Sequence, residues 1–294
     1  MTTSVAAASF LDRLGARSAA TGTVLCLGVD PDPTALPPGF PATIEGIERF
    51  ASLVVDAATP AAAAVKANLA FFEAFGSAGL AALERVRARV PSGVPVVIDA
   101  KRGDIGSTAA RQAVALFDAL GADAVTVNPY LGSEAIEPLL ERLDRYAYVL
   151  CRTSNPGAGE LQGLEVAGDG EAPAEPLWAR VARRATEWGP GGTVGLVVGA
   201  TAPRELAAIR AIAPGLGFLV PGVGAQGGDV EAVLRDGHAT SAPAADRPGS
   251  GLLVNVSRGI AGAAAAPADG SRTDLGERLA AAATGWARTL PVLP

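Results

Sequence analysis

Lysine is rare in this chain: only two of its 24 basic residues, Lys66 and Lys101, are lysines rather than arginines. An ammonium group is a compact charge that can give up its proton, which a guanidinium cannot do in a protein. Lys101 lies in the segment Asp99-Ala-Lys-Arg-Gly-Asp104, between two carboxylates. Because Asp99 and Lys101 are two residues apart on an extended segment, their side chains leave the same face. Asp99 could then hold Lys101 protonated and keep an acid beside a substrate atom.

The same residues also fit a purely structural interpretation. Asp99, Lys101 and Asp104 could form an ion-pair network, with Asp104 as the N-cap of the helix that follows. The two lysines could be chance survivors of a coding bias toward arginine, lying on a solvated face. Their position in the fold decides between these interpretations.

Apolar segments rich in β-branched residues recur along the chain, with amphipathic segments of helical length between them. The apolar segments are continuously hydrophobic, which is typical of parallel strands covered on both faces. The expected helices include Ile44–Ala58, Ala70–Val90, Ser107–Leu120 and Pro203–Ile212. The expected strands are Val24–Val29, Ala62–Lys66, Val94–Asp99, Ala124–Val127, Ala147–Cys151, Val194–Val198, Phe218–Val220 and Leu252–Val256. This alternation predicts an α/β fold, a (β/α)8 TIM barrel that forms a single domain over residues 1–294.

A doubly wound open sheet is the competing architecture. It would place a glycine-rich fingerprint after the first strand, whereas the segment Gly28-Val-Asp-Pro-Asp-Pro33 is stiff and acidic. The barrel is therefore favoured. Three stretches rich in glycine, alanine and proline, at 157–176, 238–251 and 261–270, are expected to be surface insertions rather than linkers between domains.

Polar residues gather where the expected strands end, which is where barrels carry their chemistry. Both lysines of the chain fall on such ends, and this favours a functional role over chance survival. The residues at these ends are Asp30, Lys66, Asp99 with Lys101, Asn128, Thr153 with Ser154, the Pro221-Gly222 turn, and Arg258.

The last two expected strands lead into glycine-rich turns, Pro221–Asp229 and Asn255–Ile260. Such turns let backbone N–H groups approach an anion, and a helix N-terminus after the turn favours negative charge. Arg258 adds a fork of donors suited to phosphate. Barrels often bind phosphate in these same two loops, so the sequence predicts a phosphate site here.

Composition excludes several classes of protein. A net charge of −6 and a pI near 5.0 argue against a nucleic-acid binder with a basic surface. No stretch of 18 apolar residues predicts a membrane span, and Asp12 and Arg13 interrupt the N-terminal segment where a signal peptide needs its apolar core. The expectation is a soluble, cytoplasmic protein.

Cysteine and histidine are too scarce to build a metal centre. Cys26 and Cys151 lie in apolar segments and are expected to be buried free thiols. His238 is the only histidine, so a multi-histidine metal site or a histidine base with a partner has almost nothing to use. We therefore expect neither a metal nor a cofactor.

The segment from Asp99 to Thr108, D-A-K-R-G-D-I-G-S-T, resembles the D-x-K-x-x-D-I-x-x-T signature of the orotidine 5′-phosphate decarboxylases. It is similar in particular to the longer bacterial (type 2) branch, whose version reads D-A-K-R-G-D-I. One departure is that Ala67-Asn68 stands where that branch often has Pro-Gln after the first lysine. The resemblance extends over most of the chain and includes Gly28–Pro31, Val65-Lys66, Ala70–Glu73, Asn128–Tyr130, Arg152–Asn155 and the turns after the last two strands.

The resemblance implies cofactor-free decarboxylation of orotidine 5′-phosphate to UMP, the last step of de novo pyrimidine synthesis. Lys101 would deliver a proton to the pyrimidine C6 as CO2 leaves. Asp99 and Asp104 would flank Lys101, with Asp104 supplied by the other subunit of a homodimer.

The resemblance also implies how the substrate would be held. Lys66 and Asp30 would hold the ribose and complete the array of charges, and Thr108 of the partner chain would touch the ribose. The other expected contacts are Ser154 on the pyrimidine edge, Gln226 spanning base and phosphate, and Arg258 on the phosphate, with the Pro221-Gly222 and Arg258-Gly259 turns.

Two alternatives stay open. A magnesium-dependent sugar-phosphate decarboxylase or aldolase of the same barrel family would need a further acidic metal ligand, whereas the second expected strand ends in Lys66. A non-catalytic phosphoribosyl-binding barrel would not need Asp99, Lys101 and Asp104 together.

Overall fold

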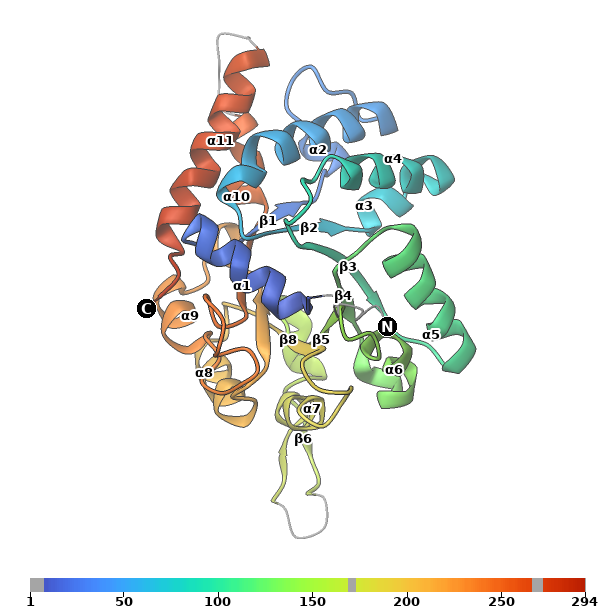
Figure 1. The fold of residues 1–294 in the computed structure, drawn as a ribbon, viewed down its shortest axis with the longest axis vertical. Helices are drawn as coiled ribbons and strands as arrows, with labels where there is room; N and C mark the ends of the chain where they lie inside the picture. The colour runs from blue at the N-terminus through green and yellow to red at the C-terminus, as the bar shows by residue number, and fades with distance from the viewer. Residues whose placement is uncertain (1–7, 169–172, 266–271, 294) are drawn as a thin grey trace, which may run out of the picture.

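In the computed structural model, residues 8–168, 173–265 and 272–293 are described. Eight parallel strands close into a barrel, and helices surround it (Figure 1). The predicted TIM barrel is confirmed. The strands follow one another around the barrel as β1 (Leu25–Val29), β2 (Ala64–Asn68), β3 (Val96–Arg102), β4 (Ala124–Val127), β5 (Tyr146–Arg152), β8 (Val194–Val198), β9 (Gly217–Val220) and β10 (Leu252–Val256).

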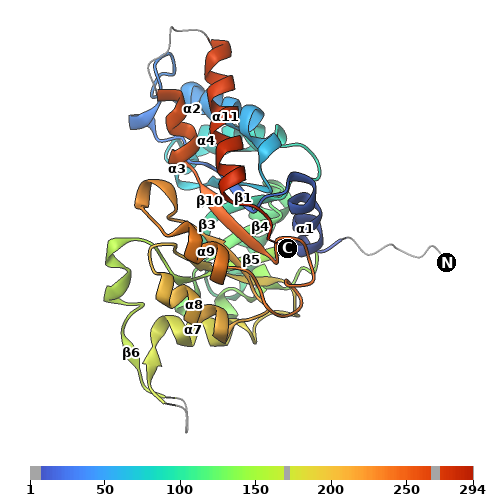
Figure 2. The same cartoon turned by 90° about the vertical axis from the view of Figure 1, so that its left-hand side faces the viewer.

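Apart from α1, the longer helices bury their apolar faces on the outer surface of the barrel, and α11 packs along α2 (Figure 2). The longer helices are α1 (Phe10–Thr21), α2 (Ile44–Ala58), α4 (Gly76–Ala88), α5 (Gly106–Ala113), α7 (Leu177–Ala185), α8 (Pro203–Ile212), α9 (Val230–Asp236) and α11 (Arg272–Thr289). The single-turn helices are α3 (Ala70–Glu73), α6 (Glu137–Leu140) and α10 (Arg258–Ala261).

Two predicted helices are interrupted. The segment predicted as Ala70–Val90 forms α3 and α4, and Gly76 begins the second helix with a positive φ of 61° that no regular helix contains. The segment predicted as Ser107–Leu120 is helical throughout, but its second half, Val114–Ala119, is wound as a π-helix. The predictions for α2 and α8 agree with the structure at both ends.

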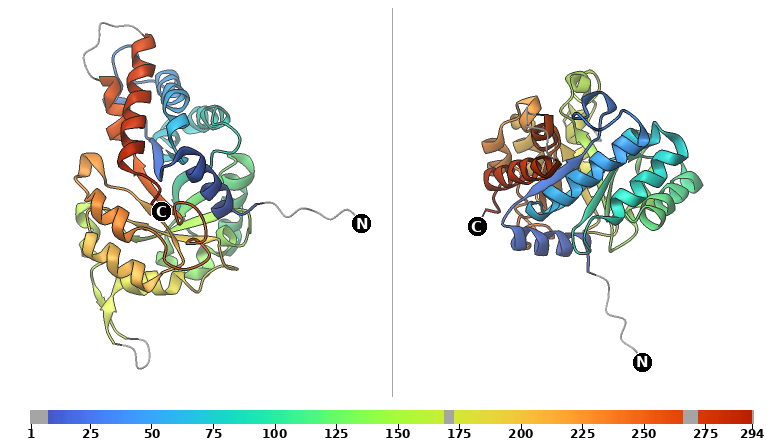
Figure 3. Two further views of the ribbon diagram at one scale, coloured as in Figure 1. Left: turned by 60° about the vertical axis from the view of Figure 1, so that its left-hand side comes forward. Right: turned by 90° about the horizontal axis from the view of Figure 1, so that it is seen from above.

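Helix α1, which the sequence analysis did not predict, closes the barrel at the amino-terminal ends of its strands. Phe10 stacks on Tyr146 with ring centroids 4.9 Å apart and meets Tyr148 edge-on. These aromatic rings fill the barrel interior near the amino-terminal ends of the strands. Small and aliphatic residues of the other strands pack with them there. Just after α1, Thr23 pairs with Pro291, so the segment that follows α1 lies beside the segment that follows α11 (Figure 3).

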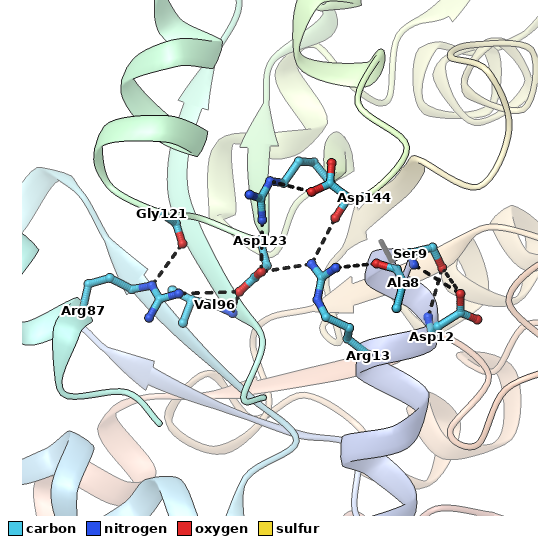
Figure 4. A network of polar contacts seen from close by, with 10 residues as sticks. Ala8, Ser9, Asp12, Arg13, Arg87, Val96, Gly121, Asp123 and Asp144 are labelled. Atoms are coloured by element: carbon cyan, nitrogen blue, oxygen red, sulfur yellow. Dashed lines mark hydrogen bonds and ion pairs between the residues drawn. The ribbon is translucent and has the colours of Figure 1, made fainter. Parts of the chain in front are cut away.

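A carboxylate fixes α1 to the barrel (Figure 4). Asp123, directly before β4, accepts hydrogen bonds from the Arg13 side chain and from the backbone N–H of Val96, each at 2.9 Å. Arg13 also donates to the carbonyl oxygen of Asp144 at 3.0 Å. This network lies at the amino-terminal ends of the strands. The polar residues predicted as the site lie at the opposite, carboxyl ends.

The three predicted insertions all lie outside the barrel strands. The first contains a short antiparallel pair, β6 (Glu165–Val166) and β7 (Glu175–Pro176), and residues 169–172 within it lie outside the described part. The second consists of turns. The third includes the end of α10 and a further helical turn, and its residues 266–270 again lie outside the described part.

Both cysteines are free and buried, as predicted, and burial raises the pKa of the Cys26 thiol to about 12. Across the described residues, no helix is long and apolar enough to cross a membrane.

Candidate active site

A pocket of about 350 Å³ opens at the carboxyl ends of the barrel strands. Its size suits a small metabolite. Leu150, Val197 and Leu219 give it an apolar floor, and the rest of its lining is mostly polar. Ten of the predicted site residues line this pocket, namely Asp30, Lys66, Asp99, Lys101, Ser154, Pro221, Gly222, Gln226, Arg258 and Gly259.

Four of these side chains form a row of alternating charge. The Lys66 Nζ lies 3.5 Å from an oxygen of Asp30 and 3.2 Å from Asp99 Oδ2. The other carboxylate oxygen of Asp99 accepts a hydrogen bond of 2.6 Å from the Lys101 Nζ. The exposed fraction of the side chain rises from 5% at Lys66 to 13% at Asp99 and 48% at Lys101. The row therefore ends in the ammonium group that is most open to a ligand.

The charges in this row stabilise one another. Burial disfavours the charged form of Asp99, but the ammonium groups of Lys66 and Lys101 outweigh it and hold the pKa of the Asp99 carboxyl well below its usual range. Burial likewise disfavours charged Lys66, but Asp30 and Asp99 outweigh it and raise the pKa of the Lys66 ammonium. Asp99 and Lys66 are thus both ionised at neutral pH, with the charges fixed before any substrate arrives.

On the opposite side of the pocket, strands β5 and β9 end in a closely packed turn. The Ser154 hydroxyl donates a hydrogen bond to Gln226 Oε1 at 3.2 Å. Gly222 lies between these two side chains with a φ of 99°, and a Cβ atom there would come within 3.1 Å of both. Only glycine fits this approach without strain. Ser154 can therefore present a hydroxyl, and Gln226 an amide, to a ligand from adjacent turns.

Arg258 and Gly259 follow strand β10 at the rim of the pocket. The Arg258 side chain is exposed and makes no hydrogen bond or ion pair with another described residue, so its donors are available to an anion. A Cβ at Gly259 would lie 2.8 Å from the Trp286 indole nitrogen, so the backbone lies directly against α11. The helix after this turn, α10, has only four residues, so a phosphate would depend on Arg258 and the backbone turns rather than on a helix dipole.

Asp104 and Thr108 do not line the pocket of their own chain. Asp104 accepts a hydrogen bond from the backbone N–H of Ile105 at 2.7 Å, and Thr108 is exposed on α5. The sequence groups Asp104 with Lys101, but among the described residues of this chain only Asp99 forms an ion pair with the Lys101 ammonium.

Six further polar residues line the pocket and were not among the predicted site residues, namely Asn68, Thr126, Thr153, Asn155, Asn255 and Ser257. Asn68 belongs to the departure from the family pattern, and its side chain accepts the backbone N–H of Ala70 at the start of α3. Thr126 and Asn255 are isolated polar residues inside apolar strands. That interruption is the signal by which both could have been found, because a buried polar group needs a partner.

Among the described residues, no group of three or more histidine, cysteine, aspartate or glutamate side chains is arranged to hold a metal ion. The absence of a metal requirement stays a prediction for the assay below.

The sequence profile of a family described as "Orotidine 5'-phosphate decarboxylase / HUMPS family" matches residues 23–272. An orotidine 5′-phosphate decarboxylase of Roseiflexus castenholzii is 49% identical over 267 residues, which cover 90% of each chain. The solved OMP decarboxylase of Leishmania donovani is 40% identical with a TM-score of 0.78 and covers 96% of this chain and 97% of that one. An orotidine-monophosphate decarboxylase structure from Toxoplasma gondii is 39% identical with a TM-score of 0.82, over 95% and 94% of the two chains.

These matches span nearly the whole barrel and include every strand that contributes to the pocket. The chain belongs to the orotidine 5′-phosphate decarboxylase / HUMPS family and is similar to its longer, type 2 decarboxylases.

Proposed function

We propose that this chain converts orotidine 5′-phosphate to UMP and CO2, the carboxy-lyase step of pyrimidine biosynthesis. The single observation that carries this proposal is the row Asp30–Lys66–Asp99–Lys101, whose charges alternate inside one pocket. The nearly full-length relative at 49% identity, itself named as this decarboxylase, supports the same reaction.

Lys101 is the proton donor in this proposal. The bond between C6 and the carboxylate breaks, CO2 leaves, and the electron pair stays on C6. The Lys101 ammonium stabilises that developing charge and gives C6 a proton, and the neutral amine then regains a proton from water. Asp99 aims the Lys101 ammonium through a hydrogen bond of 2.6 Å. A fixed ammonium stabilises a carbanion most in a site that excludes water. The Asp99 carboxylate, close to the carboxylate of the substrate, would raise the free energy of the bound ground state.

The remaining pocket residues bind the substrate. Lys66 and Asp30 lie at the end of the row away from Lys101, where an ammonium and a carboxylate can donate to and accept from ribose hydroxyls. Ser154 reads the pyrimidine edge, and Gln226 lies between base and phosphate. The phosphate binds Arg258 and the Pro221-Gly222 and Arg258-Gly259 turns at the rim. Binding energy from this remote group holds the reacting carbon in the field of the row.

We further propose that two copies of the chain form a homodimer with shared sites. Asp104 and Thr108 lie outside their own pocket, yet the family signature places them with the reacting groups. Ile105, the residue after Asp104, is 62% exposed, and Tyr130 and Leu131, which follow strand β4, are 77% and 51% exposed. Apolar side chains of this size next to unused site residues suit a surface that a second copy covers, carrying Asp104 and Thr108 into the neighbouring pocket. A cytoplasmic location and a single domain over residues 1–294 stay predictions.

Turnover should not depend on a metal ion. We expect purified protein to consume orotidine 5′-phosphate, followed by its loss of absorbance, at the same rate with and without EDTA. The physical reason is that the Lys101 ammonium supplies both the charge and the proton, so no Lewis acid is required. Activity that disappears in EDTA and returns with Mg²⁺ would establish the magnesium-dependent alternative, and no decarboxylation at all would leave a binding barrel.

Arg258→Ala should lower kcat/KM for orotidine 5′-phosphate by about 10- to 100-fold, the cost of losing a hydrogen bond to a charged group. The fold should be intact, because Arg258 is exposed and has no partner among the described residues. The lost interaction acts on the phosphate, so the rate with orotidine, which lacks the phosphate, should barely change. An equal loss on both substrates would indicate damage to the structure instead.

A further inference from the structure

Strand β3 departs from regular pairing with β4 at the residues of the charged row. Ile98 pairs with Val125 in the ladder, and the next pair is Arg102 with Val127. Three residues of β3, Asp99 to Lys101, therefore face the single residue Thr126 of β4. Extra residues on one strand form a bulge that redirects side chains and leaves backbone groups without ladder partners.

The Thr126 side chain provides the hydrogen-bond partner that the strand ladder does not give to the backbone N–H of Lys101. Its hydroxyl oxygen accepts the backbone N–H of Lys101 at 2.9 Å and donates its own proton to Asp99 Oδ1 at 2.8 Å. The same Oδ1 accepts the hydrogen bond from the Lys101 ammonium. These bonds make a closed loop from the Lys101 backbone through Thr126 and Asp99 to the end of the Lys101 side chain. Thr126 is buried, so water does not compete for its hydroxyl.

The backbone of Lys101 needs such support. Its φ of 48° lies in the left-handed region, which residues other than glycine rarely adopt. A strained conformation of this kind persists only where the surroundings hold it. Elsewhere in the described chain, Ser250 is the only other residue besides glycine with a positive φ. Among the described residues, the backbone N–H of Lys101 donates its hydrogen bond to the Thr126 hydroxyl oxygen.

We propose that Thr126 is the positioning residue of the reaction, holding the Lys101 backbone in its left-handed conformation and the Asp99 carboxylate in line with the Lys101 ammonium. A hydroxyl is required here because the position must accept one hydrogen bond and donate another. Thr126 acts through Asp99 and Lys101 rather than on the substrate. The inference rests on the proposed role of Lys101 as proton donor.

Thr126→Val keeps the shape of the side chain and removes the hydroxyl. We expect kcat to fall by about 10- to 100-fold, the effect of a small misplacement of the reacting group. KM and the Kd of the product UMP should change by no more than about twofold, because the groups that bind ribose, base and phosphate are untouched. In case valine does not fold, Thr126→Ser and Thr126→Ala form a second comparison, since they differ only in the hydroxyl. The serine variant should restore most of kcat and the alanine variant should not.

Thr193→Val is the matched control. Thr193 is equally buried, but its hydroxyl has no hydrogen-bond partner in the described part of the chain and lies outside the pocket. We expect this variant to keep the kcat of the unmodified protein. If the Thr126 variants keep full kcat, or if the serine and alanine variants lose it equally, or if the loss is in KM and UMP binding, Thr126 does not position the donor. An unmodified protein without decarboxylase activity would overturn the proposed function, and this inference with it.

Discussion

Lys101→Arg is expected to lose nearly all turnover, with kcat lower by about a hundredfold to ten-thousandfold, the usual contribution of a positioned general acid. Arginine keeps the positive charge, so the charge balance of the row with Asp99, Asp30 and Lys66 is preserved. It removes a compact acid, however, because a guanidinium does not release its proton near neutral pH. The planar group is also larger than an ammonium, and the 2.6 Å bond that aims Lys101 from Asp99 cannot be reproduced unchanged. The measurement is kcat under saturating orotidine 5′-phosphate.

Binding of UMP provides the control for this variant. UMP lacks the carboxylate that leaves, so its affinity should depend mainly on the ribose, base and phosphate contacts and should be close to that of the unmodified protein. If Lys101→Arg retained substantial kcat, the electric field of a cation, rather than proton delivery, would be the main contribution of the lysine. Loss of UMP binding as well would point to a disturbed pocket.

The sequence was sufficient for the barrel and for most of the pocket because both follow local rules. Continuous apolar segments mark strands covered on both faces, and the polar residue that ends each segment must lie at the carboxyl edge of the barrel. That reasoning places Asp30, Lys66, Asp99 and Arg258 around one pocket although they are far apart in the chain. The rare lysines added a second, independent signal.

Some of the missed features depend on interactions that a single segment does not encode. Helix α1 does carry local signals, a capping box formed by Ser9 and Asp12 and a left-handed C-cap at Gly22. Its place in the barrel follows from its contacts with Tyr146 and Tyr148, which lie on a strand far along the chain. Thr126 is a lone hydroxyl in an apolar strand, but its contact with the Lys101 backbone follows from the bulge in β3, which no periodicity reveals. The sequence could pair Asp99 with Lys101 through their spacing, but it could not show that a left-handed residue makes that pairing.

Asp104 is a different case, because one chain is insufficient to define its role. Its carboxylate lies outside its own pocket, next to the exposed residue Ile105. If Asp104 acts in the site of a partner chain, Lys101→Ala and Asp104→Ala should each be nearly inactive alone, since every site of either dimer carries a lesion. Mixing the two proteins under conditions that allow subunit exchange should then restore activity.

The expected size of that recovery follows from the two-fold arrangement. In a mixed dimer, one site takes its lysine from the Lys101→Ala chain and its aspartate from the Asp104→Ala chain, and it carries both lesions. The other site takes both groups from intact positions. Random reassortment makes about half of the dimers mixed, so about a quarter of all sites become fully intact and activity should rise toward that fraction. If Asp104 served its own chain, every site would keep one lesion and mixing would restore nothing. A tagged subunit shows whether exchange has occurred, and exchange without recovered activity would remove Asp104 from the partner's site.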